Sequence, residues 1–128
     1  MVQPFLADVA ITLLRVFGGL SMSLAHGRGK TPPSAGFIDA VAGMGLPAPE
    51  LMAWAASLAE LVGGILLAAG LLTRPAALAV AMTMGVAAFV HHASDPFQQR
   101  ELALFYGLIS LIFLVIGSGR LSLDRFLR

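Results

Sequence analysis

Four long apolar stretches, each ended by turn-forming residues, constrain the fold of this chain more than any other feature. A helix needs about 20 mostly apolar residues to cross a hydrocarbon layer about 30 Å thick. Residues 5–25, 51–72, 75–92 and 102–116 reach or approach this length. Glycines, prolines and cations follow the first stretch, and glycines follow the last; such residues end helices. The sequence therefore predicts four membrane spans in a single transmembrane domain over residues 1–128.

The composition favours a surface that faces lipid. Apolar residues make up 58% of the chain and charged residues 12%, whereas an ordinary soluble domain carries about 25% charged residues. A soluble four-helix bundle is the alternative, but its helices would show polar stripes on their outer faces. The third and fourth stretches show none. We therefore expect an all-α fold, a transmembrane four-helix bundle in contact with the lipid bilayer.

The loop after the first span has helical character of its own. Phe37, Ile38, Val41 and Met44 recur at helical spacing, which predicts a short interfacial helix in the first loop. At the other end of the first span, the first positive side chain is Arg15. A cleavable signal has a charged leader before its apolar core, so we expect the first apolar stretch to remain in the mature protein.

Charge and cysteine content exclude several classes of function. The net charge is +1 and no basic cluster is evident, which argues against nucleic acid as a partner. The sequence contains no cysteine. Disulfides, thiolate metal sites and cysteine-held iron–sulfur clusters are therefore excluded from this sequence.

The distribution of cations predicts an orientation. Four spans place both termini on one side of the membrane, together with the turn at Arg74. That side holds four arginines, and the opposite side holds Arg28, Lys30 and Arg100. The positive-inside rule therefore favours a multi-pass protein of the cell membrane with cytoplasmic termini.

Two charges lie deep within the predicted spans. Arg15 is about 16 Å from the end of the first span, counted from His26, and Glu60 is about 15 Å from the start of the second at Glu50. Intramembrane charges face the protein interior and usually pair. The sequence therefore predicts an Arg15–Glu60 ion pair. Such a pair can fix the register of two helices, or take part in ligand binding or proton transfer, and both interpretations stay open.

A second polar group lies at one membrane face. It comprises His26, His91 and His92 at helix ends and Glu50 and Glu101 at helix starts. Imidazoles and carboxylates at one level can relay protons or bind a divalent metal. No His-x-x-x-His pair occurs, so His26, His91, His92 and Glu101 are only weak metal candidates and we predict no metal site. A polar ligand pocket or an ordinary set of interface residues accounts for them better.

The order of several short motifs resembles the DoxX family of small four-helix integral membrane proteins, over nearly the whole chain. In the first half the matching residues are Leu14-Arg15, Gly18-Gly19, His26-Gly27, Lys30, Gly36-Phe37 and Gly45-Leu46-Pro47. In the second half they are Glu60, Gly63-Gly64, Gly70-Leu71-Leu72-Thr73-Arg74, His91, Glu101 and Gly117-x-Gly119-Arg120-Leu121-Ser122-Leu123-Asp124.

The resemblance implies a link to membrane redox chemistry. Some members of the family are membrane subunits of thiosulfate:quinone oxidoreductase, and others belong to membrane-associated oxidative-stress complexes. It therefore implies a quinone-associated subunit of a membrane redox complex, possessing a quinone as cofactor and a redox partner subunit. Carried over by position, Arg15, His26, Glu60 and His91 are the expected ligand-binding residues.

Two other functions fit the same sequence. The first is a non-enzymatic membrane anchor or assembly partner for another protein, since the first loop and the C-terminal tail offer docking surfaces. The second is a small transporter or channel, because intramembrane charges can mark a permeation path. Four short helices leave little room for a conduit, so this function would require a homo-oligomer.

Overall fold

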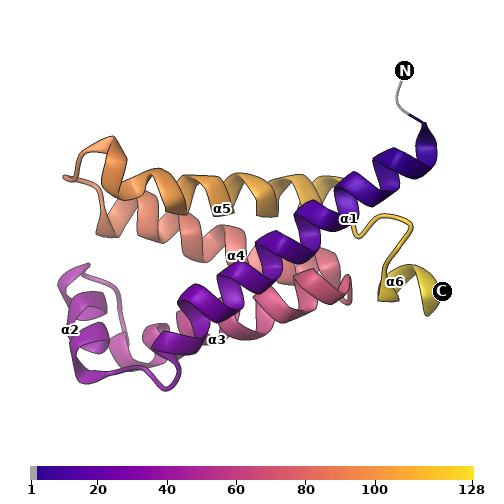
Figure 1. Ribbon diagram of the computed structural model, residues 1–128. Helices are drawn as coiled ribbons and strands as arrows, with labels where there is room; N and C mark the ends of the chain where they lie inside the picture. The colour runs from indigo at the N-terminus through magenta and orange to yellow at the C-terminus, as the bar shows by residue number, and fades with distance from the viewer. Residues whose placement is uncertain (1–2) are drawn as a thin grey trace.

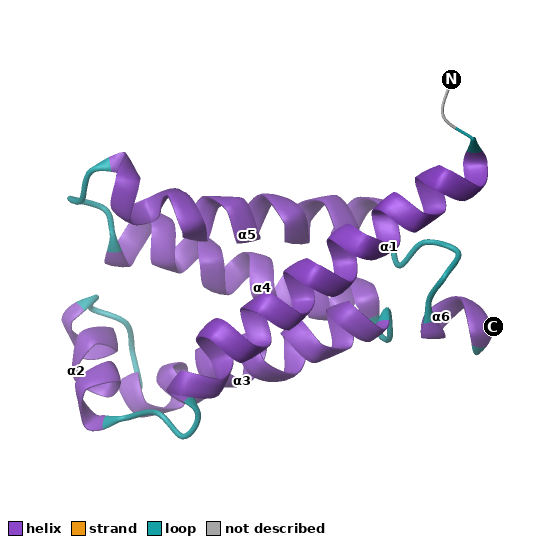
Figure 2. Ribbon diagram, in the orientation of Figure 1, coloured by secondary structure: helices purple, strands orange, loops and turns teal. Residues whose placement is uncertain are grey.

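The computed structural model describes residues 3–128, which are helical along most of their length (Figures 1 and 2). Four helical stretches are long and apolar enough to cross a membrane: Pro4–Lys30, Pro49–Ala69, Thr73–His91 and Phe97–Ile116. No strand occurs in residues 3–128. The prediction of an all-α fold with four potential spans is confirmed. The first two residues of the expected domain lie outside the described part.

The first span is longer than the sequence predicts. Helix α1 (Pro4–Ser21) continues through a π-helical segment (Met22–Gly27) and a 3₁₀ turn (Arg28–Lys30). Gly27 and Arg28 keep right-handed helical dihedrals, with φ of −63° and −60°. Gly27 therefore does not end the helix. Its lack of a side chain allows the helix to pack closely against the backbone of α3.

The predicted helix in the first loop is present as α2 (Ala35–Gly43). Ser34 caps it, since its hydroxyl accepts a hydrogen bond from Phe37 N at 3.1 Å, the usual means of satisfying a free N–H at a helix start. Helix α2 packs against α3 (Pro49–Ala69) and buries Val41.

The remaining spans form a hairpin beside α3. Helix α4 (Thr73–Val86) continues through a second π-helical segment (Ala87–His91) and returns as α5 (Phe97–Ile116). In space α5 lies along α4, α4 along α3, and α3 along α1. The start of α1 and the short helix α6 (Leu123–Phe126) lie at the same end of the bundle, away from α2 (Figure 1). We call these the terminal end and the loop end.

Small residues allow α1 and α3 to approach closely. A Cβ added at Gly19 would lie 2.5 Å from Ala68 N and 2.5 Å from Gly64 O, and one at Gly27 would lie 2.3 Å from Leu61 N. All three distances are shorter than real Cβ contacts, so a side chain at either position would separate the helices. Small residues at such spacing are the usual means by which helices associate in lipid.

The tail after α5 folds back onto the turn between α3 and α4. Leu72 adopts a left-handed conformation (φ 48°) at the start of α4 and cannot cap that helix with its own side chain. Asp124 does so instead, because its two carboxylate oxygens accept from Leu72 N at 2.8 Å and Thr73 N at 3.0 Å. Gly70 O also accepts from Asp124 N at 2.8 Å.

Large apolar side chains cover much of the outside of the bundle. Four of them are each more than half exposed: Phe17, Met82, Phe105 and Val115. Exposure of such apolar side chains is unfavourable in water and favourable among lipid tails. Only 11% of the span in α5 is buried within the chain. The bundle therefore contacts the lipid bilayer along these faces.

Candidate functional site: a cavity with a buried ion pair

A cavity of about 540 Å³ lies among α2, α3 and α4, nearer the loop end. Its wall is mostly apolar: alanine and methionine side chains predominate, with an aromatic ring from α2. Polar groups come from Lys30, Glu60, Thr83, His91 and His92. The apolar residues are Phe37, Ala40, Val41, Met44, Leu46, Met52, Ala55, Ala56, Ala59, Ala79, Met82, Val86 and Ala87.

A salt bridge between Lys30 and Glu60 lies in the cavity wall. Lys30 Nζ is 3.0 Å from each carboxylate oxygen of Glu60. The glutamate is 2% exposed, whereas the lysine side chain is 36% exposed. A carboxylate buried to this degree requires a charged or hydrogen-bonding partner, and Lys30 provides it.

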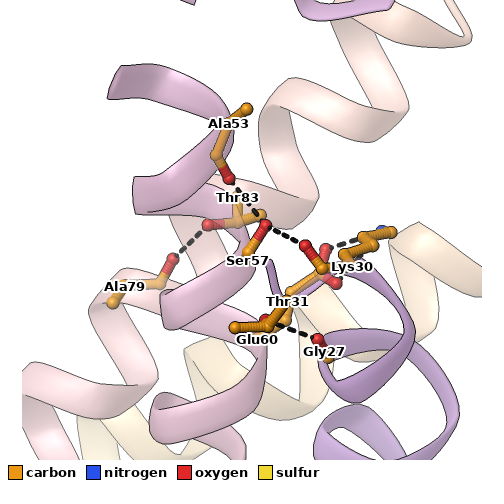
Figure 3. A network of polar contacts seen from close by, with 8 residues as sticks. All are labelled: Gly27, Lys30, Thr31, Ala53, Ser57, Glu60, Ala79 and Thr83. Carbon is orange, nitrogen blue, oxygen red and sulfur yellow. Dashed lines mark hydrogen bonds and ion pairs between the residues drawn. The ribbon is translucent and has the colours of Figure 1, made fainter. Parts of the chain in front are cut away.

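Backbone and hydroxyl contacts fix the position of Lys30 (Figure 3). Ser57 Oγ lies 2.8 Å from Lys30 O and 2.7 Å from Ala53 O, and its proton can be donated to either carbonyl. Thr31 Oγ1 donates to Gly27 O at 2.8 Å. The ammonium also lies 5.6 Å from the centre of the Phe37 ring, within range of a cation–π interaction. The end of the first span is thus tied to α3 and α2 around the cavity.

The histidines contribute the loop-end rim of the cavity. The rings of His91 and His92 lie 4.5 Å apart in an edge-to-face arrangement, and His92 Nδ1 is 2.7 Å from Asp95 Oδ2. His91 is the last residue of the second π-helical segment, while the first such segment leads toward Lys30. Single π-helical turns are frequent at functional sites, and the second one contributes Ala87 and His91 to the cavity wall.

The predicted Arg15–Glu60 ion pair is wrong. Arg15 is buried, but its guanidinium donates to the backbone carbonyls of Ser118 and Leu121, the latter at 2.9 Å. Glu60 is bound by Lys30 instead. Of the expected ligand-binding residues, the structure brings Glu60 and His91 to the cavity and places Arg15 elsewhere.

The error arises from the register of α1 against α3. Gly27 lies against the backbone of Glu60 and Leu61, while Arg15 lies beside Gly70 at the far end of α3. Twelve residues separate positions 15 and 27 in the sequence, or about 18 Å of helix. The two deep charges therefore lie at different depths. The prediction assumed that the first span ended at residue 25, which misaligned it with the second.

Two of the predicted residues, His26 and Glu101, lie outside the cavity wall. His26 does not line the cavity; its ring packs edge-to-face on Tyr106, with centroids 5.3 Å apart. Glu101 lies exposed near the start of α5. In residues 3–128 no three His, Cys, Asp or Glu side chains are grouped closely enough to hold a metal ion.

The sequence pattern did not predict Lys30 as the partner of Glu60. The signal was present, because Lys30 follows His26 by four residues and would share its helical face. That signal has meaning only if the helix passes through Gly27 and Gly29. Glycines followed by prolines predict a helix end, and a helix that ends there leaves Lys30 in a loop.

Four potential spans in a bundle, with a cavity among α2, α3 and α4 that contains an ion pair, define a small multi-pass membrane protein with a candidate ligand site. More specifically, the chain belongs to the DoxX family, whose family model matches residues 10–93. The resemblance noted in the sequence is thereby confirmed.

Two curated relatives are similar to this chain. A Bacillus subtilis protein named "Putative oxidoreductase CatD" is 32% identical over 120 residues, covering 93% of this chain and 87% of that protein. A Haemophilus influenzae protein named "Uncharacterized protein" is 40% identical over 76 residues, or 54% of this chain, and the match spans 57% of that protein's length. No solved structure matches the chain.

Proposed function

We propose that this chain is the quinone-binding membrane subunit of a redox complex, and that the cavity among α2, α3 and α4 holds the quinone ring. The observation that carries the proposal is a cavity of about 540 Å³ with mostly apolar walls and one ion pair, between the partly exposed Lys30 and the buried Glu60. Its volume lies within the range of about 300–1,000 Å³ typical of small-molecule sites. A flat apolar ring with polar carbonyl groups suits such walls.

The polar groups of the cavity match the chemistry of quinone reduction. The quinone takes up two electrons and two protons to form the quinol. Lys30 Nζ carries three protons and uses two directions toward Glu60, so its third proton is available to a quinone carbonyl oxygen. His91 is exposed at the rim, where an imidazole can exchange protons with water. The electrons come from a redox centre in a partner subunit.

Further observations support this assignment. A relative covering nearly the whole chain is named as an oxidoreductase, and the family resemblance implies quinone-linked subunits. We also propose the cell membrane as the location, with the termini in the cytoplasm. The positive-inside rule supports this orientation, because four arginines lie at the terminal end and only Arg28, Lys30 and Arg100 lie at the loop end.

Binding of a short-chain ubiquinone to the purified chain in detergent tests the proposal. We expect Lys30→Met and Glu60→Gln to weaken binding by about tenfold, the loss of one hydrogen bond to a polar ligand group. Arg28→Gln and Glu50→Gln are matched controls, since both residues are exposed and neither lines the cavity. We expect the controls to bind as the unchanged chain does.

Loss of a buried partner can unfold a protein, so stability is measured alongside binding. Lys30→Met leaves the Glu60 carboxylate unpaired, at a cost of about 3 kcal/mol. The double variant Lys30→Met/Glu60→Leu removes both charges and should recover most of that stability without recovering quinone binding. Undiminished quinone binding by the folded double variant would overturn the assignment of the site.

A further inference from the structure

A second cavity, of about 410 Å³, lies at the terminal end, where α4 begins and α5 ends. Four arginines line it: Arg74, Arg120, Arg125 and Arg128. Its remaining lining residues come from the turn before α4, the glycine-rich segment after α5 and the side of α6. It shares no lining residue with the first cavity, and the proposed function does not use it.

Positively charged side chains outnumber negatively charged ones in the lining of this cavity. Asp124 is the single acidic side chain among its lining residues, and both of its oxygens already accept from the backbone of Leu72 and Thr73. Arg120 reaches Asp8 at 3.6 Å, and Arg74 donates to the carbonyl of Val115 at 3.2 Å.

Two of the arginines have no bound counter-charge in the described part of the chain. The side chains of Arg125 and Arg128 make no hydrogen bond or salt bridge with residues 3–128, and both residues are exposed. Behind the wall, the buried guanidinium of Arg15 donates to the carbonyl of Ser118, which lines the cavity. A cavity with this charge distribution attracts an anion.

The position of the cavity identifies the kind of anion. It opens where two spans end, which is the level of the lipid headgroups. Leu72 and Ile116 line it and are 57% and 49% exposed, so an acyl chain descending from the cavity would cover them. A soluble anion would leave these side chains uncovered.

We propose that this arginine-lined cavity binds the phosphate group of an anionic phospholipid, with the acyl chains lying along α4 and α5. Arginine suits this role because its planar guanidinium can donate two parallel hydrogen bonds to phosphate oxygens. Basic pockets beside spanning helices bind acidic lipid headgroups by the same chemistry.

Native mass spectrometry of the full chain in neutral detergent tests the proposal, with phosphatidylglycerol and phosphatidylcholine as probes. We expect one tightly bound phosphatidylglycerol and weaker binding of phosphatidylcholine. Arg125→Gln/Arg128→Gln should weaken phosphatidylglycerol binding by about 20-fold, from the loss of two cation contacts. Neither side chain makes a hydrogen bond or ion pair among the described residues. The charge of Arg128 acts on Asp124 more weakly than the hydrogen bonds from Thr73 and Leu72 do, so we expect this variant to fold.

Two controls separate this site from other causes of binding. Arg28→Gln/Arg100→Gln removes the same charge from the loop end and should leave the affinity unchanged; an equal loss there would show non-specific attraction and overturn the proposal. Inorganic phosphate is tested without phospholipid. Binding of inorganic phosphate as tight as that of phosphatidylglycerol would show that the acyl chains contribute nothing, and would overturn a lipid in favour of a soluble phosphate ligand. Equal binding of phosphatidylglycerol and phosphatidylcholine would show that the cavity does not select an anionic lipid, and would overturn the proposal.

Discussion

Two buried charges show how differently intramembrane ions can be satisfied. Glu60 is held by the ammonium of Lys30 in the wall of a cavity, whereas Arg15 is held by backbone carbonyls of the tail. The Lys30–Glu60 pair leaves a proton donor beside a cavity large enough for a ligand. The hydrogen bonds of Arg15 instead hold the C-terminal tail against α1. Charge type and depth alone did not distinguish them.

The sequence predicted correctly that both residues turn inward, because hydrocarbon excludes an unpaired charge. It could not predict the partners. Carbonyl acceptors have no sequence signature, so Ser118 and Leu121 carried no signal as partners for Arg15. Lys30 and His91 were visible as polar residues near helix ends, but their meeting at the cavity depends on how α1 and α4 cross α3.

Asp124 should make the stability of the bundle depend on pH. Burial alone raises the pKa of this carboxyl, but hydrogen bonds from Thr73 and Leu72 and the charge of Arg128 outweigh burial and hold the pKa below its ordinary value. A lowered pKa means that the ionised form is favoured in the folded state. This stabilisation is complete above the ordinary value of about 4 and disappears as pH falls through the lowered value.

The variant Asp124→Asn tests this contribution. We expect it to lower the free energy of unfolding by about 1 kcal/mol at neutral pH, since a charged cap of α4 is lost. As pH falls below the ordinary pKa of an aspartate, about 4, the difference from the unchanged chain should narrow. Thermal unfolding in detergent, followed by circular dichroism, measures both. Asp39→Asn, at an exposed position of α2, is the control, and an equal effect there would contradict the assignment.

At the scale of the helices, glycine has two opposite roles in this chain. Gly70 adopts φ of 68° at the end of α3 and stops that helix, as sequence rules anticipate. Gly27 stays helical because α3 presses against it. Composition cannot separate these roles, since only the neighbouring helix decides between them. The existence of the helices was therefore predictable, but not the end of the first span.

Adding one methyl group to a contact glycine should separate α1 from α3. We expect Gly19→Ala to lower the free energy of unfolding by about 1–3 kcal/mol, the usual cost of overpacking, because the new Cβ meets backbone atoms of Ala68 and Gly64. Unfolding in a denaturing detergent measures the change.

Gly85→Ala in α4 is the matched control. A Cβ at that position meets no atom within 4 Å, and alanine favours the helix by up to about 1 kcal/mol. We expect the stability of this variant to be equal or higher. Similar losses in both variants would show that close packing of α1 on α3 does not explain the effect.

At the scale of the whole molecule, the fold class followed from how little charge the chain carries. An apolar exterior required lipid, and the lengths of the stretches required four crossings, so the architecture was predictable without any contact. The two cavities were not. Each is formed by residues from at least three separated segments, and their side chains converge only once the helices have packed.

The absence of cysteine from the sequence makes the proposed orientation simple to test. We expect Ser94→Cys, in the loop between α4 and α5, to react with a membrane-impermeant maleimide added to intact cells. Gln3→Cys, at the exposed start of α1, should react only after the membrane is permeabilised. The unchanged chain controls for background labelling, and the reverse pattern would place the termini outside.

The contact between Arg15 and Ser118 joins residues that are 103 positions apart. During synthesis, the first hydrophobic segment leaves the ribosome long before the carbonyl groups that accept hydrogen bonds from its arginine. A nascent chain inserted only as far as α5 therefore contains Arg15 without its carbonyl acceptors. Until the tail is synthesised, water or a lipid phosphate must accept the hydrogen bonds of this arginine. Quality-control proteases that recognise unsatisfied intramembrane charge would consequently have a means of distinguishing truncated copies from complete ones.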